Sequence, residues 1–429
     1  MRVGTAWEDI TPSKPLHLLG QMHVRLGQYA RDPLTANAVV LDDGTTRVAM
    51  VSVDVCVLPK ERVDALRTAC AASCEIDPES VIIAATHTHV APCTANLVGD
   101  ICPEFLETLE QAVARAVGRA IEDLEDASLF AGTGFIEQMG WNRRGLHRDG
   151  SAGMYLGSWA EGFVGIEGPR DGSVPVIFVR RADGSVKAVL TGFSTHPNTL
   201  EGESFYSADI PGEVRRVLRA VLGENVGVLY FTGAAGNTAP SIMVDNPQNI
   251  QPWRGEQGLR RSGQYLGGEI LKTIAEQITP VPDPVLRHGH SEIGIPIRPW
   301  DEHSDFSRFG GGMLEFFEKS KADWDRMLRE ESPVATPIDV VRVGDAALCF
   351  NPAELYCEFG LAIKEKSPAR VTLVSELANA WVGYVPTPQA IRHGGYSAQS
   401  SWVTKLAPDA GWMIVEKTRE LLAEVFGEG

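Results

Sequence analysis

The sequence predicts an α/β fold, with a mixed β-sheet core flanked by helices, because segments of strand character alternate with segments of helical character. Apolar, β-branched runs of strand length are bounded by turn dipeptides such as Asp43-Gly44 and Asp183-Gly184. Between these runs, apolar residues recur with the 3.6-residue period of an amphipathic helix. Because low-complexity tracts and internal repeats are absent, we expect a single large catalytic domain over residues 1–429.

The predicted elements follow one another along the chain. Buried strands are predicted at Val48–Val57, Val81–Ala85, Val174–Arg180, Val186–Gly192, Val226–Thr232, Ile338–Val343 and Val371–Val374. Helices are predicted at Lys60–Ser73, Pro103–Leu124, Ile210–Leu222, Leu259–Ile278, Leu314–Glu331, Ala353–Lys366 and Gly411–Phe426. The Gly- and Pro-rich segment Gly145–Gly172 is predicted to be a long loop, and loops of that length are often functional.

Composition excludes several classes of protein. With 429 residues, of which 44% are hydrophobic and 22% charged, the chain can bury a large core, which excludes disorder. The formal net charge of -17 would repel nucleic acid and anionic membrane surfaces, so we expect neither as a partner. We expect a small-molecule substrate instead, and self-association into a homo-oligomer is left open.

The cysteines and the start of the sequence both favour the cytoplasm. The seven cysteines are an odd number and contain no C-x-x-C pair, a pattern typical of reduced thiols. The first residues carry Glu8 and Asp9 and contain no apolar segment that could serve as a secretory signal. No later run is long enough to span a membrane. We therefore expect a cytoplasmic protein without membrane insertion.

The sharpest local signal is the pair His87 and His89 in Thr86-His87-Thr88-His89, which directly follows an apolar strand. On an extended backbone, side chains at positions i and i+2 share a face, so both rings would project from the end of that strand. Strand ends are where open α/β sheets place their sites. The pair fits a metal site, and it fits equally well two histidines that bond to backbone carbonyls.

Three further segments carry polar groups next to predicted strands. His196 follows Val186–Gly192 and precedes Pro197, which repeats the arrangement of the first pair. Glu354 follows Asn351-Pro352-Ala353 at the predicted start of a helix, where an acidic residue could also complement the helix dipole. Tyr384 and Tyr396 lie twelve residues apart in a turn-rich stretch.

Taken in this order, the motifs resemble the catalytic N-terminal domain of the neutral/alkaline, non-lysosomal ceramidase family, whose members are zinc amidases. The likeness covers nearly the whole chain, and its most specific parts are the Thr-His-Thr-His segment and the spacing of the two tyrosines. Its landmarks are Asp9–Pro12, Gln21–Arg25, Val51–Asp54, Thr86–His89, Asn142-Arg143, Thr195–Pro197, Phe231–Ser241, Pro352–Glu354 and Gly383–Tyr396.

The resemblance implies a zinc site and a set of auxiliary residues. The positions that match family zinc ligands are His87, His196, Glu354 and Tyr384. His89 matches a histidine that handles protons beside the metal, and Arg143 and Tyr396 match residues that contact the substrate or the developing oxyanion. Nitrogen and oxygen ligands without a thiolate also suit a catalytic zinc on chemical grounds.

Other candidate residues have competing structural explanations. His288-Gly289-His290 is a second His-x-His pair, which we interpret as a solvated strand because the other family landmarks are missing around it. Cys70 and Cys74 are helical neighbours in an apolar pattern, which favours packing over metal binding. Asn237 stands where the family commonly has aspartate. Asp209 could orient a ligand or cap the helix that follows it.

The leading hypothesis for function is a zinc-dependent amidohydrolase that cleaves an N-acyl bond. A zinc hydrolase or lyase acting on a carbohydrate derivative is the alternative, for which Trp141 and Trp159 could supply a stacking surface. A non-catalytic metal- or ligand-binding protein is the third. Secreted ceramidases carry a signal peptide and a C-terminal β-sandwich domain, which this sequence does not show. We therefore expect a bacterial-type short member with a small, soluble substrate and a narrow polar pocket lined by Arg143.

Overall fold

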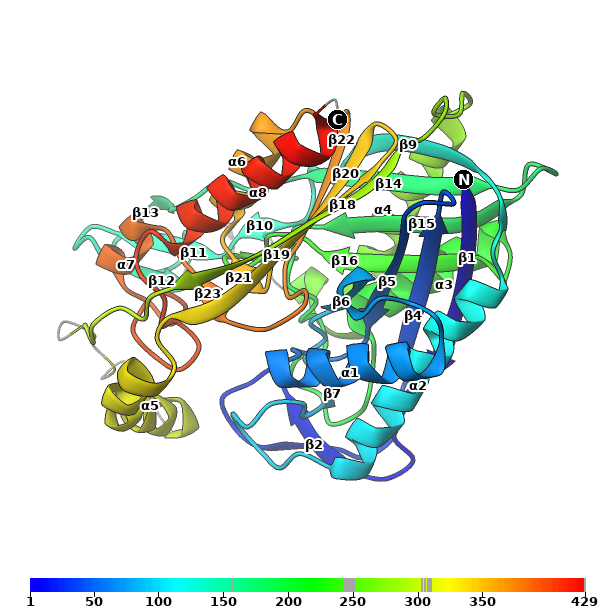
Figure 1. Cartoon of the computed structure of the whole chain (residues 1–429). Helices are drawn as coiled ribbons and strands as arrows, with labels where there is room; N and C mark the ends of the chain where they lie inside the picture. Colours follow the sequence, from blue (N-terminus) through cyan, green and yellow to red (C-terminus); the bar gives the residue numbers. More distant parts are fainter. Residues whose placement is uncertain (156, 242–250, 302–303, 305, 307–310, 428–429) are drawn as a thin grey trace.

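The computed structural model describes residues 1–155, 157–241, 251–301, 304, 306 and 311–427. Within these residues the strands form three larger mixed sheets and several sheets of two or three short strands (Figure 1). Helices alternate with strands along the chain and lie on the outer sides of the sheets. The predicted α/β class is confirmed.

The first sheet comes from the N-terminal part of the chain. Its strands, in spatial order, are β6 (Val81–Ala85), β5 (Arg47–Val53), β4 (Thr35–Asp42), β1 (Arg2–Asp9) and β8 (Glu125–Asp126). Two helices pack on one face of it, α1 (Lys60–Ser73) and α2 (Pro103–Glu122). The apolar stripe of α2, which includes Leu109, Val113 and Val117, is buried against β1 and β4. Each such side chain contributes roughly 1.5–3 kcal/mol by leaving water, which holds the helix on the sheet.

The second sheet lies beside the first. Its strands, in spatial order, are β16 (Gly227–Thr232), β15 (Val186–Phe193), β14 (Ser173–Arg180) and β9 (Ser128–Phe135). β15 and β16 run parallel and are joined through α3 (Asp209–Leu222), which packs against α4 (Gly255–Glu276). Every residue of β15 is buried, including Lys187, whose ammonium group forms ion pairs with Asp123 and Glu125.

The third sheet is C-terminal. Its strands, in spatial order, are β18 (Leu286–Ile295), β19 (Val334–Val343), β20 (Ala346–Phe350) and β22 (Val371–Ser375). β20 and β22 run parallel and are joined through α6 (Cys357–Lys366). The closing helix α8 (Ala410–Phe426) packs on β18 and β19, whereas α5 (Gly311–Glu330) lies at the periphery of the molecule (Figure 1).

One apolar core is shared by all three sheets. Met50 from the first sheet, Ile177 and Leu229 from the second, and Val341 and Leu348 from the third belong to the same buried cluster, and each is at most 1% exposed. A core of this kind fixes the sheets relative to one another because interiors are close-packed and resist shear. Loops at the strand ends are therefore held in place by the packing of the whole fold.

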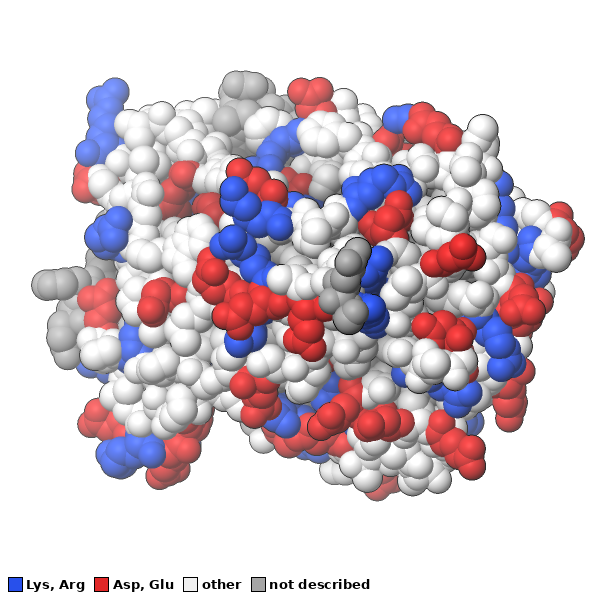
Figure 2. All heavy atoms as spheres, turned by 45° about the horizontal axis from the view of Figure 1, so that its top comes forward, with Lys and Arg blue, Asp and Glu red and all other residues white. Residues whose placement is uncertain are grey.

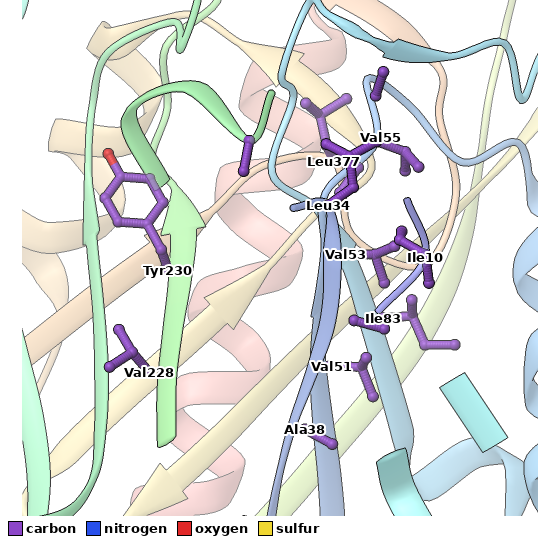
Figure 3. Close-up of a cluster of buried hydrophobic side chains, with 14 of the residues drawn as sticks. Ile10, Leu34, Ala38, Val51, Val53, Val55, Ile83, Val228, Tyr230 and Leu377 are labelled. Carbon is purple, nitrogen blue, oxygen red and sulfur yellow. The ribbon is translucent and has the colours of Figure 1, made fainter. Parts of the chain in front are cut away.

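A second buried cluster lies between the first two sheets and the helices that cover them. Figure 3 shows part of it, with Val51, Val53 and Ile83 from the first sheet and Val228 and Tyr230 from β16. The apolar side chains of β5 and β6 are buried on both faces, as the unbroken apolar runs of these strands predict.

Short elements complete the fold between and beyond the large sheets. The short strands are β2 (Leu16–Leu19), β3 (Arg25–Gly27), β7 (Ala91–Pro92), β10 (Trp141–Asn142), β11 (Arg144–His147), β12 (Ala152–Met154), β13 (Phe163–Ile166), β17 (Thr238–Ala239), β21 (Ala353–Leu355) and β23 (Gly383–Val385), and one further short helix is α7 (Pro388–His393). The predicted loop Gly145–Gly172 thus contains most of a three-stranded sheet, in which β11 pairs with β12 and β13.

The helix predicted over Ala353–Lys366 is wrong at its start. Residues Ala353–Leu355 form β21, which pairs in parallel with β23, and α6 begins only at Cys357. Pro352 has no N–H, and the pairing with β23 satisfies the backbone groups that follow it, so tertiary contacts override the local helical pattern. Glu354 consequently lies on a strand.

The surface carries charges of both signs. Figure 2 shows acidic and basic side chains interspersed over the face drawn, although the sequence holds 56 acidic and 39 basic residues. Among the helices of the described residues, none combines the length and the apolar character that a membrane crossing requires.

Candidate metal centre and active site

Strand ends from all three sheets meet at one place. Thr232, at the end of β16, donates its hydroxyl hydrogen to the Thr86 carbonyl at 2.8 Å. The backbone carbonyl of Thr232 accepts a hydrogen bond from the Glu376 N–H at 2.9 Å. The Ala85 N–H, at the end of β6, donates to the Leu377 carbonyl at 3.1 Å. The chain segments that leave β6, β16 and β22 are thereby bonded to one another. A crevice at strand ends is the usual location of a site in α/β proteins.

His87 is held in a strained conformation. Its backbone φ is 67°, in the left-handed region that costs a residue of this type about 1–3 kcal/mol. Its Nδ1 lies 2.8 Å from the Cys56 carbonyl oxygen, and its Nε2 lies 3.5 Å from Oε2 of Glu354. The predicted extended backbone through His87 and His89 is wrong, because β6 ends at Ala85. The left-handed turn, instead of strand alternation, brings the two rings together, with 4.8 Å between their centroids.

His196 approaches from the second sheet. The chain leaves β15 at Phe193, and Nδ1 of His196 donates to the Ala235 carbonyl at 2.7 Å, which turns Nε2 toward Glu354 Oε2 at 3.6 Å. The ring is fully buried and stacks on Tyr384 with an interplanar angle of 6°. The loop that follows β16 therefore fixes the tautomer and the direction of this ring.

Glu354 approaches from the third sheet through β21. Its Oε2 faces both histidines, while its Oε1 accepts a hydrogen bond from the Trp381 indole N–H at 3.1 Å. The side chain is only 5% exposed. The carboxylate is therefore oriented by one neutral donor, and its second oxygen points at the two Nε2 atoms.

The donor set fits a zinc ion. The ligand atoms of His87, His196 and Glu354 lie within 4.8 Å of one another, and all three residues are buried. Both histidines donate Nδ1–H to a backbone carbonyl, the arrangement that presents Nε2 to a metal. A second compact set contains Cys56, His87 and His89. We favour the first set because the His87 Nδ1, which faces the Cys56 sulfur, already bonds to the Cys56 carbonyl.

The electrostatics of the site also suit a cation. Burial raises the pKa of Glu354, but His87 and His196 outweigh this effect and hold it well below its usual range. Burial and the Arg143 guanidinium lower the pKa of His196 well below its usual range. At neutral pH the site therefore presents a carboxylate and a neutral imidazole, the ligand states that a metal requires. Burial opposes a charge on His87, yet Cys56 and Glu354 raise its pKa well above the usual range, so a metal ion held there would have to displace a proton.

The two predicted tyrosines and the predicted arginine lie at the same place. The Tyr384 hydroxyl is 3.3 Å from Nε2 of His196 and 2.9 Å from the Tyr396 hydroxyl. Nη2 of Arg143 lies 3.0 Å from Nε2 of His196 and donates to the Gly236 carbonyl at 3.0 Å. Burial, together with the Glu354 charge, raises the pKa of Tyr384 well above its usual range, so its phenol is neutral.

His89 lies between the set His87, His196 and Glu354, called the metal-type cluster below, and the partly buried carboxylate of Glu201. Its Nε2 is 3.3 Å from Nε2 of His87, and its Nδ1 is 3.5 Å from Oε2 of Glu201. Glu201 forms an ion pair with Arg254 and accepts a hydrogen bond from the Asn198 amide at 3.0 Å. Burial lowers the pKa of His89 to about 4. The ring is thus neutral at pH 7 and is bracketed by the site on one side and by Glu201 on the other.

A cavity of about 1180 Å³ lies next to this cluster, and its wall includes Tyr384 and Tyr396. Its polar lining includes His89, Arg143 and Glu201, and its apolar lining includes Met154 and Met313. The predicted pocket with Arg143 in its wall is present, but it is roomy instead of narrow. Segments far apart in the sequence form its walls. The distance between these segments in space sets the width of the cavity, and the sequence does not predict that distance.

The remaining sequence predictions have different outcomes. Trp141 stacks under the Arg170 guanidinium at 4.8 Å, and among the described residues neither Trp141 nor Trp159 lines the cavity, so the predicted stacking surface is wrong.

Cys70 is buried beside α2 as a free thiol, as predicted, and all seven cysteines are free. Asp209 is the first residue of α3, and the N-cap position is occupied by Ala208. The Asp209 carboxylate accepts the N–H groups of Ile210 at 2.7 Å and of Leu200 at 2.9 Å, so it ties the start of α3 to the preceding loop.

The side chains of Asn237 and of the second His-x-His pair make contacts that hold elements of the fold together. The Asn237 amide donates to Glu358 at 2.8 Å and its carbonyl oxygen accepts the Cys357 N–H at 2.8 Å, so it ties the loop after β16 to α6. His288 and His290 do lie on a strand, β18, but both bond to the buried carboxylate of Asp339 at 2.8 and 2.9 Å. The predicted strand is confirmed and His290 is exposed, but the bonds of both rings to Asp339 were not predicted.

Two acidic residues of the site escaped the sequence reasoning. Oε2 of Glu376 accepts the N–H groups of Ala235 and Leu355, each at 3.0 Å, so it joins the loop that orients His196 to the strand that carries Glu354. Burial raises the pKa of Glu376 well above its usual range. Its position directly after the apolar run of β22 was the available signal. Glu201 offered none beyond lying five residues after His196.

Comparison with known proteins supports the fold. No protein-family model matches the sequence, and no curated protein matches it significantly. Neutral ceramidase from Pseudomonas aeruginosa superposes with a TM-score of 0.78 at 17% identity, over 99% of this chain and 74% of that chain. A ceramidase complexed with C2 superposes with a TM-score of 0.75 at 16% identity, over 99% of this chain and 75% of that one. The chain has the neutral ceramidase fold, as the motifs predict.

Proposed function

We propose that this protein is a zinc-dependent amidohydrolase that cleaves the N-acyl bond of a small, soluble substrate. The observation that carries the proposal is the convergence of His87, His196 and Glu354, from three separate segments, next to a large cavity. The likeness of the fold to that of a neutral ceramidase, an amide hydrolase, supports the same class of reaction.

The proposed ion would be held by His87, His196 and Glu354, with Tyr384 as the fourth ligand. When bound, zinc supplies Lewis-acid chemistry, because it lowers the pKa of water to roughly 7 and polarises a carbonyl oxygen. Glu376 keeps the supporting segments in register through its two backbone hydrogen bonds. Outer contacts of this kind commonly affect metal affinity by about 10–100-fold.

The other side chains divide the remaining tasks of amide hydrolysis. Arg143 and Tyr396 stabilise the negative charge that develops on the amide oxygen, since both line the cavity and the guanidinium is 3% exposed. His89 accepts the proton that the attacking water loses, on Nε2, and passes it to the nitrogen of the leaving amine. Glu201 faces Nδ1 of His89 at 3.5 Å and fixes the ring so that Nε2 faces the reaction centre.

The carbohydrate alternative loses its structural support, because it depended on Trp141 and Trp159 as a stacking surface beside the substrate. Both lie outside the cavity wall formed by the described residues. A non-catalytic binding protein would have no use for a neutral histidine and a guanidinium placed beside the same cluster of ligands.

The test is a substrate panel for the zinc-loaded protein at one enzyme concentration. It comprises short soluble N-acyl amines, uronic-acid and amino-sugar derivatives, and detergent-dispersed long-chain ceramide. We expect release of free amine from a short N-acyl compound, loss of that activity with a chelator, and its return with zinc. Cleavage of ceramide within tenfold of the best soluble compound, or products from sugar derivatives alone, would contradict the proposal.

A variant of Arg143 separates catalysis from metal binding. Arg143→Ala should lower turnover by roughly 10²–10³-fold, the usual loss when one oxyanion-stabilising donor is removed, while zinc content is unchanged. Arg170→Ala, which removes a guanidinium that stacks on Trp141 outside the cavity, is the matched control and should retain activity.

A further inference from the structure

A small, mostly apolar recess lies beside the metal-type cluster and adjoins the large cavity. The lining residues common to both spaces are Gly20, Gln21, Met22, His89, Tyr384 and Tyr396. Its volume is about 40 Å³. Three of the four predicted metal ligands and both residues His89 and Tyr396 border it, so it reaches the reaction centre. The rest of its lining is Leu19, Gly20, Gln21, Met22, Cys56, Val57, Leu97, Val98, Trp381 and Val403.

The size of the recess limits what can enter it. A water molecule needs about 10–15 Å³ of volume measured in this way, so the recess holds about three groups of that size. The walls cannot easily yield, because Val57 and Val403 are each 2% exposed and belong to the packed cores. Enlarging such a space by side-chain displacement typically costs about 1–3 kcal/mol.

The distribution of charge tells the two spaces apart. Arg143 and Glu201 line only the large cavity, whereas beyond His89 and the predicted metal ligands the ionisable groups among the described lining residues of the recess are the Cys56 thiol and the Tyr396 phenol. A leaving amine is polar and becomes cationic on protonation, so it belongs on the side of His89 and Glu201. The substituent on the other side of the amide carbonyl is an alkyl group, which suits an apolar wall.

We propose that this recess is the acyl pocket of the enzyme and that it admits acyl groups of about two to four carbons. The substrate class is then a short-chain N-acyl amine whose polar amine portion occupies the large cavity. This inference rests on the proposed amidohydrolase function and adds a direction of binding and a limit on chain length.

The first test is a series of one soluble amine acylated with acetyl, butyryl, hexanoyl and octanoyl groups. We expect kcat/KM to fall at least tenfold between butyryl and octanoyl, because one or two surplus methylenes in a closed apolar pocket already change this ratio by about 10–200-fold. Equal or rising kcat/KM with chain length would overturn the proposal, even though it would leave amide hydrolysis intact.

A variant that enlarges the recess sharpens the test. Leu97 borders the recess from a loop and touches none of the ligand side chains through a hydrogen bond, so Leu97→Ala should shift the preferred acyl group toward longer chains. Leu271→Ala, at a partly buried leucine of α4, is the matched control and should leave the preference unchanged. A variant at Leu97 with wild-type chain-length preference would contradict the assignment.

The acyl pocket can also be tested without turnover, by measuring the binding of the carboxylates that N-acyl hydrolysis would release. Calorimetry of the zinc-loaded protein with acetate, butyrate and octanoate should show octanoate binding at least tenfold more weakly than butyrate, and Leu97→Ala should reduce that difference. If no N-acyl compound is hydrolysed, the proposed function fails, and this series still tests the recess. Tighter binding of octanoate than of butyrate by the wild-type protein would refute the acyl pocket.

Discussion

The chain contains two His-x-His pairs, and the structure uses them in opposite ways. In the first pair and its partner His196, the rings of His87 and His196 donate Nδ1–H to backbone carbonyls, and their Nε2 atoms converge on Glu354. In the second pair, both rings direct a nitrogen at one carboxylate oxygen of Asp339.

The difference lies in which acceptor the N–H group of each ring is bonded to. When the N–H groups point away to the backbone, the lone pairs are left to face one another and can hold a cation. When the N–H groups point at a carboxylate, the cluster is already neutralised. Asp339 is fully buried and also accepts the Asn379 amide at 2.7 Å, and Asn379 in turn bonds to Ile83 of β6. The second pair therefore stabilises the contact between two sheets.

The largest expected effect comes from the first pair. His89→Ala should lower turnover of the best N-acyl substrate by roughly 10²–10⁴-fold, the range for a general acid–base residue, with zinc content near that of the wild type. Steady-state kinetics and elemental analysis of the same preparation check this. His290→Ala is the control from the second pair and should retain turnover. Loss of zinc along with activity would show that His89 is a metal ligand. It would then be wrong that His87 binds the metal while His89 transfers protons.

The second largest effect should be on stability alone. Asp339→Ala removes the buried acceptor of two histidines and one amide, and it should lower the free energy of unfolding by about 3–5 kcal/mol, as expected when one partner of a buried charged cluster is lost. Denaturant titration measures it. Asp345→Ala, which removes a half-exposed ion pair with Arg370, should cost less than about 1 kcal/mol. Similar losses for the two variants would mean that the buried cluster contributes no more than a surface pair.

The smallest effect is a pH dependence of stability from the second pair. The hydrogen bond to Asp339 raises the pKa of His290. A raised pKa stabilises the fold fully below the unfolded-state value of about 6.5, and the contribution disappears as the pH rises through the folded-state value. The stability difference between wild type and His290→Ala should therefore shrink from pH ~6 to pH ~9, by less than about 1 kcal/mol because the ring is partly exposed. A difference that is constant or grows over this range would be inconsistent with the ion pair.

The sequence predicted most elements of the fold but not their division into sheets. The bounds of α1 and β6 agree with prediction to the residue, because each is a long or strongly apolar segment with clear ends. The start of α6 was misplaced, because the pairing of β21 with β23 joins residues about thirty positions apart. No local pattern encodes such a pairing.

The sequence singled out residues that the fold brings together, but it did not predict their geometry. The predicted residues do meet, but the left-handed turn at His87 that aims its ring is a tertiary constraint, since nothing in Thr-His-Thr-His requires a positive φ. Glu201 and Glu376 were missed because each acts through contacts with distant segments, at His89 and at the N–H groups of Ala235 and Leu355. Contacts of this kind are set by the packing of three sheets around one core.

The most direct measurement is the zinc content of three purified proteins: wild type, the double variant His87→Ala with His196→Ala, and the double variant His288→Ala with His290→Ala. The two double variants each delete two imidazoles, so they are matched in chemistry and differ in site. We expect one zinc per chain in the wild type, none in the first double variant and one in the second double variant. A wild type without stoichiometric zinc, or a first variant that keeps it, would contradict the claim that the converging histidines form a metal centre.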